Sequence, residues 1–455
     1  MYSNPNRLEK SSLLTVSSAT LRFEKKNHEK KMIQPLLIST YDPKGGAGAA
    51  GAAYRLHQGL IQVGVDSKML VQDQRIDDST VMGAPNKVAQ RMWKARPVLD
   101  ALPLQFYRNR QRHPVLFSVQ WLPDIITSRI AALNPDVVNL HWIGDGFVAA
   151  EALSEFNKPI VWTLHDMSAF TGGCCYSQEC DGYTKSCGNC PILGDNKSWD
   201  LSRWVWQRKA KAWQNLKLTV VSPSKWLADC ARSSSLFKNS DIRVIPYGLD
   251  TGTYKPCDRQ TARNILNLPQ DRQLILFGAM NSSNERKGFP LLMQALKQLS
   301  NYENSQKWEL IVVGASQPKE KLDIDLKTRY LGTLNDDISL ALIYAAADVF
   351  VAPSVQDNLP NTVMEALACG TPCVAFQIGG MPDLIEHKQN GYLAHPFATE
   401  DLAQGIAWVL ESRQRWQVLS SRAREKVEQE FTLEKQARRY LSVYEEVSTT
   451  TFKQS

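Results

Sequence analysis

The stretch from Pro353 to Phe376 constrains the fold more than any other part of this 455-residue chain. A short apolar run over 348–352 predicts a strand that ends at the proline. A polar loop follows, and a helix is predicted over about 360–370, because proline suits a first helical turn and glycine ends helices. Cys373–Phe376 then predicts a second buried strand. Strand, loop, helix and strand together indicate one unit of an α/β fold.

Two carboxylates in this stretch, Asp357 and Glu365, are eight positions apart. The first falls in the predicted loop and the second about one turn inside the predicted helix. Free N–H groups and the helix dipole attract anions to a helix N-terminus, phosphate above all. We therefore expect both side chains to face a ligand that is held at this end of the helix.

The chain is too long for a single hydrophobic core, so two domains are expected. No apolar run approaches the ~18–20 residues of a membrane helix. The net charge of +7 permits attraction to anionic lipid or to a phosphorylated substrate. Residues 1–31 are polar and basic without a secretory h-region, which predicts a loose tail, with Met32 as an alternative start. A cytoplasmic location is expected, either free or at the inner face of the membrane.

A glycine-rich loop follows the first predicted strand, 36–40, and contains Gly45 and Gly46. A helix is predicted after it to about Gly64, and a second strand over 65–71. One interpretation is a nucleotide-binding loop. The other is a tight turn that lets the helix pack closely on the sheet.

Two later strands, predicted over 137–140 and 160–164, are each followed by a histidine, His141 and His165. A polar residue directly after a buried parallel strand lies at the carboxyl edge of the sheet, where open α/β folds bind ligands. The pair therefore indicates a ligand site. For His141, a strand cap that bonds to the backbone is an open alternative.

Residues 75–125 combine basic and aromatic side chains without a readable pattern. A surface of this kind suits anionic lipid headgroups or a lipid-phosphate acceptor. The alternative is a solvated insertion with a few aromatics packed down. The residues concerned are Lys87, Arg91, Met92, Trp93, Lys94, Arg96, Leu102, Leu104, Phe106, Tyr107, Arg108, Arg110 and Arg112.

Five of the nine cysteines fall within a loop at 172–191. Four thiolates at this spacing suit a tetrahedral zinc, with Cys175 as the spare. A site closed by four thiolates has no open position, so its role would be structural. Disulfides and free thiols are the alternatives. The predicted zinc ligands are Cys174, Cys180, Cys187 and Cys190.

The second half of the chain repeats the alternation of strands and helices. Two such halves predict an α/β fold with two doubly wound parallel sheets that face each other across a cleft, in domains 32–250 and 251–430. Strands are predicted at 273–277, 309–313, 330–332 and 391–393, and helices at 203–213, 289–299, 338–346, 400–412, 414–430 and 433–447.

Two adjacent cations, Arg286 and Lys287, follow the first strand of the second half. They therefore fall on the same sheet edge as Asp357 and Glu365. A cation pair that faces a helix N-terminus is suited to a diphosphate. A carboxylate one turn into that helix accepts hydrogen bonds from a vicinal diol. Diphosphate and diol together describe a nucleotide-sugar.

Over about residues 33–430 the chain resembles the retaining glycosyltransferases of family four, which have the GT-B fold of two Rossmann-like domains. The most specific match runs from Asp357 through Glu365 to the turn Gly370-Thr371-Pro372. The cysteine loop further resembles a subgroup of exopolysaccharide and colanic-acid-type enzymes. The match also covers Gly45-Gly46, 163–166, 221–224, 245–250 and 286–288.

The resemblance implies transfer of a sugar from a nucleotide-sugar to a glycan or lipid-linked acceptor, with retained configuration and no catalytic metal. No nucleic-acid partner is expected, because the net charge is small and the cysteines lack the spacing of zinc fingers. By it, Glu365 binds the ribose hydroxyls, Asp357 contacts the donor sugar, and His165 lies near the reacting carbon. It also implies that the helix in 431–455 crosses back to the first domain. The remaining donor site comprises Lys287 and Arg286 on the diphosphate, the Gly45-Gly46 loop, Asn358, Leu359 and Asn361.

Departures from the family pattern leave other functions open. The family usually has glutamate where Asp357 stands, and Pro360 lacks an N–H for a phosphate contact. Family members often have an arginine just after the strand that ends here at Gly278. This chain has Ala279-Met280-Asn281 there instead. A nucleotide-sugar epimerase or hydrolase, or an inactive nucleotide-sugar binder, is the alternative to a transferase.

Overall fold

A computed structural model describes residues 32–46, 48–111, 117–278, 285–314, 323–334 and 336–452. The predicted tail, Arg112 and the segment Ala279-Met280-Asn281 lie outside the described residues. Among the helices in these ranges, none is both long and apolar enough to cross a bilayer.

The first lobe is built on a sheet of seven parallel strands, most of them buried because their sequences are short apolar runs. Its strand order is β3-β2-β1-β4-β5-β6-β7. The strands are β1 (Pro35–Tyr41), β2 (Lys68–Asp73), β3 (Val81–Met82), β4 (Val137–Leu140), β5 (Ile160–Thr163), β6 (Leu218–Ser222) and β7 (Asp241–Val244).

The second lobe is built on six parallel strands in the order β10-β9-β8-β11-β12-β13. The predicted limits of the edge strand were wrong. The strand was predicted over 330–332, whereas β10 ends at Tyr330. The strands are β8 (Gln273–Gly278), β9 (Trp308–Val313), β10 (Lys327–Tyr330), β11 (Val349–Ala352), β12 (Cys373–Phe376) and β13 (Gly391–Ala394).

In both sheets the strand order runs outward in one direction and then reverses, which confirms the predicted doubly wound fold. The reversal lies between β1 and β4 in the first lobe and between β8 and β11 in the second. Ligands of open α/β sheets bind beyond the carboxyl ends of the strands at such a point. The loops after these four strands are therefore the place to look for a site.

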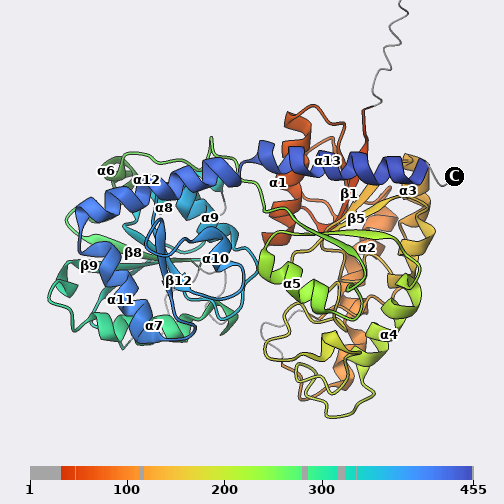
Figure 1. Ribbon diagram of the computed structural model, residues 1–455, viewed down its shortest axis with the longest axis horizontal. Helices are drawn as coiled ribbons and strands as arrows, with labels where there is room; N and C mark the ends of the chain where they lie inside the picture. The colour runs from red at the N-terminus through yellow and green to blue at the C-terminus, as the bar shows by residue number, and fades with distance from the viewer. Residues whose placement is uncertain are drawn as a thin grey trace, which may run out of the picture. The chain divides into compact units, whose positions relative to one another are not determined.

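Helices pack against the sheets (Figure 1). The two longest in the described ranges, Arg413–Glu430 and Leu433–Phe452, lie where helices were predicted, whereas the helix Lys87–Asp100 was not predicted. The helix of the 353–376 unit begins at Asn361, so Pro360 is its N-cap residue and not part of its first turn. The helices are α1 (Gly48–Gln62), α2 (Lys87–Asp100), α3 (Thr127–Leu133), α4 (Leu201–Trp213), α5 (Lys225–Ser233), α6 (Arg259–Ile265), α7 (Phe289–Leu299), α8 (Asp337–Ala346), α9 (Asn361–Ala368), α10 (Met381–Leu384), α11 (Thr399–Leu410), α12 (Arg413–Glu430) and α13 (Leu433–Phe452).

The C-terminal helices divide between the lobes. Helix α12 packs on α9 of the second lobe, whereas α13 packs along α1 of the first lobe (Figure 1). Two buried tyrosines of α13 reach the first sheet: Tyr440 bonds to Thr163 at 2.9 Å and Tyr444 donates to Asn139 at 2.6 Å.

The chain passes between the lobes twice, and the two crossings are hydrogen-bonded to each other. The N–H of Leu249 donates to the carbonyl of Phe431 at 2.7 Å, and the N–H of Leu433 donates to the carbonyl of Leu249 at 3.2 Å. We call this pairing the hinge. Gly248 beside it has no space for a side chain, since an added Cβ would lie 2.9 Å from Cα of Leu433.

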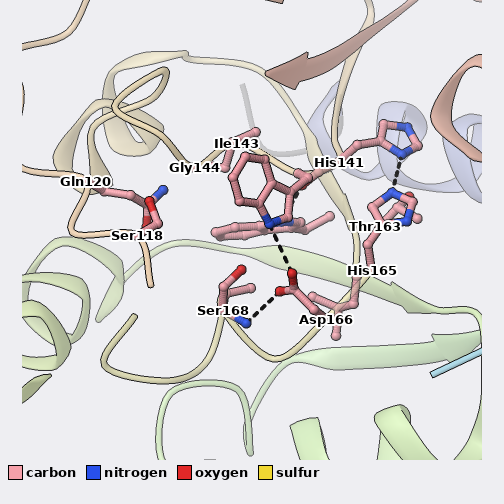
Figure 2. A pocket seen from close by; sticks show the side chains of 13 residues that line it. Ser118, Gln120, His141, Ile143, Gly144, Thr163, His165, Asp166 and Ser168 are labelled. Atoms are coloured by element: carbon pink, nitrogen blue, oxygen red, sulfur yellow. Dashed lines mark hydrogen bonds between the residues drawn. The ribbon is translucent and has the colours of Figure 1, made fainter. Parts of the chain in front are cut away.

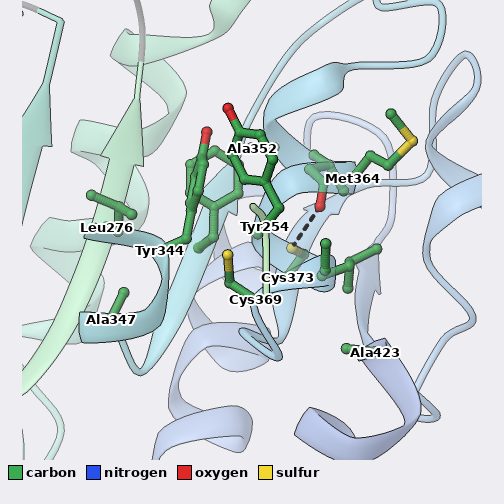
Figure 3. Packing of buried hydrophobic residues seen from close by; sticks show 14 of the residues in the cluster. Tyr254, Leu276, Tyr344, Ala347, Ala352, Met364, Cys369, Cys373 and Ala423 are labelled. Carbon is green, nitrogen blue, oxygen red and sulfur yellow. Dashed lines mark hydrogen bonds between the residues drawn. The ribbon is translucent and has the colours of Figure 1, made fainter. Parts of the chain in front are cut away.

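The core beneath α9 mixes small and aromatic side chains (Figure 3). Ala366 and Leu367 face this core, where alanines allow α9 to pack closely on the sheet. Tyr254 and Tyr344 line the same cluster, and Figure 3 shows their hydroxyls pointing toward the same side. The core therefore fixes α9 and presents two phenols beside it.

The region 75–125 is more regular than its sequence indicated. It holds β3, α2 and a 3-10 helix over Leu102–Phe106. Trp93 packs on Phe147 with ring centroids 5.7 Å apart, whereas Met92 is 63% and Phe106 88% exposed. One aromatic is thus packed down, and other large apolar side chains of the segment are in solvent.

Candidate functional site

A carboxylate with two cations lies at the reversal point of the second sheet. Lys287, in a short turn after β8, donates from Nζ to Oδ2 of Asp357 at 2.6 Å. Nη1 of Arg286 lies 3.1 Å from Oδ1 of the same carboxylate and donates to the carbonyl of Gln356 at 2.8 Å. We call Arg286, Lys287 and Asp357 the clamp.

The charge state of the clamp follows from these contacts. Burial alone would raise the pKa of Asp357, but the charges and hydrogen bonds of Lys287 and Arg286 hold that pKa well below its usual range. Asp357 is therefore ionised at neutral pH. A diphosphate that enters here meets two cations which already share one carboxylate.

The backbone around the clamp is packed without spare space at three glycines. Gly288 has φ +70°, and an added Cβ would lie 1.8 Å from the carbonyl oxygen of Pro353. Gly379 and Gly380 lie under the loop, where an added Cβ would come 2.0 Å from the carbonyl of Asp357 and 1.6 Å from that of Asn358 respectively. These glycines allow the loop to sit where the clamp can form.

Asn358 connects the second lobe to the first. Its Nδ2 donates to the carbonyl of His165 at 3.0 Å, and its Oδ1 accepts from the hydroxyl of Ser224 at 2.6 Å. Asn358 is directly bonded in sequence to Asp357 of the clamp. The structure therefore brings His165 close to the clamp, through the backbone carbonyl of the histidine.

The ring of His165 is engaged on both nitrogens. Nε2 lies 2.9 Å from Nδ1 of His141, and Nδ1 lies 2.8 Å from the hydroxyl of Tyr247. Figure 2 shows the two histidines facing each other beside a small cavity that Asp166 also lines. Burial lowers the pKa of His165 to about 3, so the ring is neutral at physiological pH. His141 is thus more than a strand cap.

Glu365 lies on α9 and forms a second contact between the lobes. Its Oε1 accepts from Nη2 of Arg55 at 2.7 Å, and its Oε2 accepts from the hydroxyl of Tyr344 at 3.1 Å. The sequence analysis did not single out Arg55, because one arginine on an amphipathic helix has the pattern of a solvated face. Only the fold reveals its partner, 310 positions away.

The Gly45-Gly46 loop is folded around a buried aspartate. Asp42 is fully buried, and its carbonyl accepts from the N–H groups of Gly45 and Gly46 at 3.0 Å each. Both N–H groups therefore bond inside the loop, as in a tight turn, and a contact of this loop with the donor stays a prediction. Sequence reasoning missed Asp42, although an aspartate before a Gly-Gly pair is a turn signal.

Of two further residues of the predicted donor site, Leu359 is buried in the core and Asn361 lies where the two lobes meet. The side chain of Leu359 is buried in the core under α9, so it offers no side-chain contact to a ligand. Asn361 lies at the start of α9 and donates from Nδ2 to the carbonyl of Gly48 at 3.2 Å. The N-termini of α1 and α9 thus meet.

The cysteine loop lies in the first lobe and reaches the clamp. Tyr176 lies under the guanidinium of Arg286, with the ring centroid 4.4 Å from Cζ. All nine cysteines of the chain are free thiols, so no disulfide is formed. The four predicted zinc ligands line one small cavity, and burial raises the pKa of Cys187 to about 12.

No three of the His, Cys, Asp and Glu side chains in the described ranges are grouped closely enough to hold a metal ion. The zinc site therefore stays a prediction. We expect one zinc per chain in protein purified without chelator, and a lower melting temperature after its removal. Metal analysis with thiol titration checks this, and metal-free protein with nine titratable thiols would contradict it.

Family models match both lobes. Residues 47–253 match the model described as Glycosyltransferase Family 4, and residues 271–412 match the model described as Glycosyl transferases group 1. Together with the two doubly wound sheets, these matches define the chain as a glycosyltransferase of group 1 with the GT-B fold.

Curated relatives carry transferase names. The chain is 36% identical over 362 residues to the sulfoquinovosyl transferase SQD2 of Arabidopsis thaliana, covering 77% of this chain and 64% of the relative. It is 26% identical over 326 residues to a D-inositol 3-phosphate glycosyltransferase of Saccharomonospora viridis, covering 68% of this chain and 70% of that one.

Solved structures share the fold. Sucrose-phosphate synthase from Thermosynechococcus elongatus superposes with a TM-score of 0.66 at 19% identity, covering 92% of this chain and all of that one. HepE of Anabaena, solved in complex with UDP-glucose, superposes with a TM-score of 0.57 at 16% identity, again over 92% and 100%.

Proposed function

We propose that this chain transfers a sugar from a nucleotide-sugar donor to a hydroxyl of a glycan or lipid-linked acceptor, in polysaccharide or glycoconjugate synthesis. The observation that carries the proposal is the clamp at the reversal point of the second sheet. In it the Asp357 carboxylate lies 2.6 Å from Nζ of Lys287 and 3.1 Å from Nη1 of Arg286. Relatives named as transferases and a related structure with UDP-glucose support the same donor class.

In this proposal the donor lies between the lobes. Lys287 and Arg286 hold the diphosphate, Asp357 contacts hydroxyls of the donor sugar, and Glu365 takes the ribose diol. Asn358 is already tied to the backbone of His165, so the sugar would bind next to that contact. Both nitrogens of the neutral His165 ring are bonded, to His141 and to Tyr247, so a hydrogen bond from this ring to a sugar hydroxyl would have to replace one of those two contacts.

The chemistry proposed is front-face transfer with retention of configuration. The bond from the anomeric carbon to the diphosphate breaks, the acceptor oxygen attacks the same face, and the leaving phosphate takes the acceptor proton. Lys287 and Arg286 stabilise the charge that grows on the leaving group. Asp357 is committed to these two cations, which disfavours a covalent intermediate of the glycosidase type.

Two measurements test the function. We expect one nucleotide-sugar in a panel to raise the melting temperature, because a bound ligand stabilises the folded state. With that donor and a glycan or lipid-linked acceptor, nuclear magnetic resonance of the product should show the donor's anomeric configuration. Release of free nucleotide at full rate without acceptor would instead indicate a hydrolase or an epimerase.

The acceptor side of the proposal includes a membrane surface. Helix α2 and the turn after it expose apolar side chains next to basic ones, a pattern suited to anionic headgroups. Lipid-linked acceptors would then meet the first lobe at the bilayer. The exposed residues concerned are Lys87, Val88, Arg91, Met92, Lys94, Val98, Leu99, Leu102, Phe106 and Arg108.

We expect the double substitution Met92→Ser and Phe106→Ser to weaken binding to phosphatidylglycerol vesicles at least about tenfold, because two exposed apolar side chains no longer enter the lipid. Vesicle sedimentation measures this. Val418→Ser, at a 49% exposed position of α12, is the matched control and should bind like the wild type. Equal binding of wild type to neutral and anionic vesicles would argue against the basic surface.

A further inference from the structure

Arg55 of α1 and Tyr344 of α8 hold the carboxylate of Glu365 from two directions. Nη2 of Arg55 donates to one oxygen at 2.7 Å, and the hydroxyl of Tyr344 donates to the other at 3.1 Å. The side chains of Arg55 and Glu365 are only 17% and 7% exposed. One of these two partners comes from the first lobe and one from the second.

The other arm of the Arg55 guanidinium is unused. Nη1 is buried and has no hydrogen-bond partner among the described residues. The ring of Tyr254 lies beside the guanidinium, 5.5 Å from centroid to Cζ. The Tyr254 hydroxyl accepts from Nη2 of Arg55 at 3.5 Å and donates to Asp337 at 2.8 Å, so it does not serve Nη1. A buried charged donor without an acceptor is unfavourable, and a ligand oxygen would satisfy it.

The position of Arg55 fits a ligand that spans the lobes. Its helix begins at Gly48, whose carbonyl accepts from Asn361 at the start of α9. The guanidinium itself is bonded to Glu365, so it lies beside the helix that follows the Asp357 loop. A guanidinium carries its donors in a rigid fork, so one arm can hold a carboxylate while the other contacts a second group.

We propose that Arg55 is a donor-binding residue supplied by the first lobe: Nη2 holds Glu365 in place, and Nη1 donates to an oxygen of the nucleotide part of the donor. The inference rests on the proposed function, in which Glu365 takes the ribose diol. It adds a reason for the lobes to bind the nucleotide together, because Arg55 belongs to the first lobe and the clamp to the second.

The test is calorimetric titration of full-length protein with UDP, GDP and ADP, each used separately. For the diphosphate that binds wild type most tightly, Arg55→Ala should weaken binding by about 10–100-fold, since one buried charged partner is lost. Arg55→Lys should recover only part of the affinity, because an ammonium cannot fork between two acceptors. Melting temperatures of both variants show whether they fold.

The control is Lys225→Ala, which removes a different and more exposed ion pair between the lobes, Lys225 with Asp383 at 3.7 Å. It should leave nucleotide affinity unchanged. Folded R55A protein that binds the diphosphate as well as wild type, or better, would overturn the inference. An equal loss in K225A would also overturn it, since docking of the lobes would then be the cause. Wild type that binds none of the three would overturn the proposed function itself.

Discussion

Lys287→Ala is expected to lower the rate of sugar transfer by about 10²–10³-fold, the usual loss when one donor to a transition-state anion is removed. Lys287 makes the shortest contact of the clamp, 2.6 Å to Asp357, and Arg286 alone would remain opposite the leaving diphosphate. Steady-state kinetics at saturating donor measure the effect, at an assay temperature well below the melting temperature of the variant. Turnover unchanged from wild type would remove the clamp from the mechanism.

The control for this substitution is Lys426→Ala. Lys426 is also largely buried and paired, with Glu386 at 2.7 Å and Glu430 at 3.1 Å, but it lies on α12. Loss of its pairs should affect stability without a comparable loss of rate. A fall in rate in both variants would point to general destabilisation rather than to catalysis.

Gly380→Ala is expected to destabilise the second lobe by about 3 kcal/mol or more, because the added methyl group overlaps backbone. Its Cβ would lie 1.6 Å from the carbonyl oxygen of Asn358 and 2.9 Å from Cβ of Ser224. The backbone at Gly380 has φ −87°, which alanine adopts freely, so the effect is steric. The loop that carries Asp357 must then move.

Thermal unfolding measures the stability of this variant, and nucleotide titration measures its donor site. Gly51→Ala is the control, since among the described residues no heavy atom outside the backbone of its own helix and its chain neighbours lies within 4 Å of the added Cβ. Inside α1 that change should stabilise by about 0.5–1 kcal/mol, because alanine favours helices over glycine. A G380A protein as stable as wild type would mean that the Gly379-Gly380 turn does not support the loop.

The secondary structure could be predicted from sequence where apolar runs are bounded by turn residues. The predicted limits of β4, α7 and β12 coincide with the observed ones for this reason. Strand β10 has the polar sequence Lys327–Tyr330 and lies at the sheet edge, so its position follows from pairing with β9 and not from its own pattern. Helix α2 was missed because few of its side chains are buried.

The candidate site was predictable where residues fall in the loops that follow predicted strands. Lys287, Asp357 and His165 were found in this way, and the structure joins them through Asn358. Arg55 depends on a partner 310 positions away, which no local pattern reports. The Gly379-Gly380 turn depends equally on the loop that happens to pass above it.

The hinge has a consequence for how a substrate can enter. The two connecting segments of the hinge are hydrogen-bonded to each other at Leu249. Both must therefore bend at one point when the lobes separate. Opening is then expected to be a rigid-body rotation of the two lobes about a single axis through the hinge. Contacts between the lobes outside the hinge, such as Lys225 with Asp383, would separate as the lobes rotate.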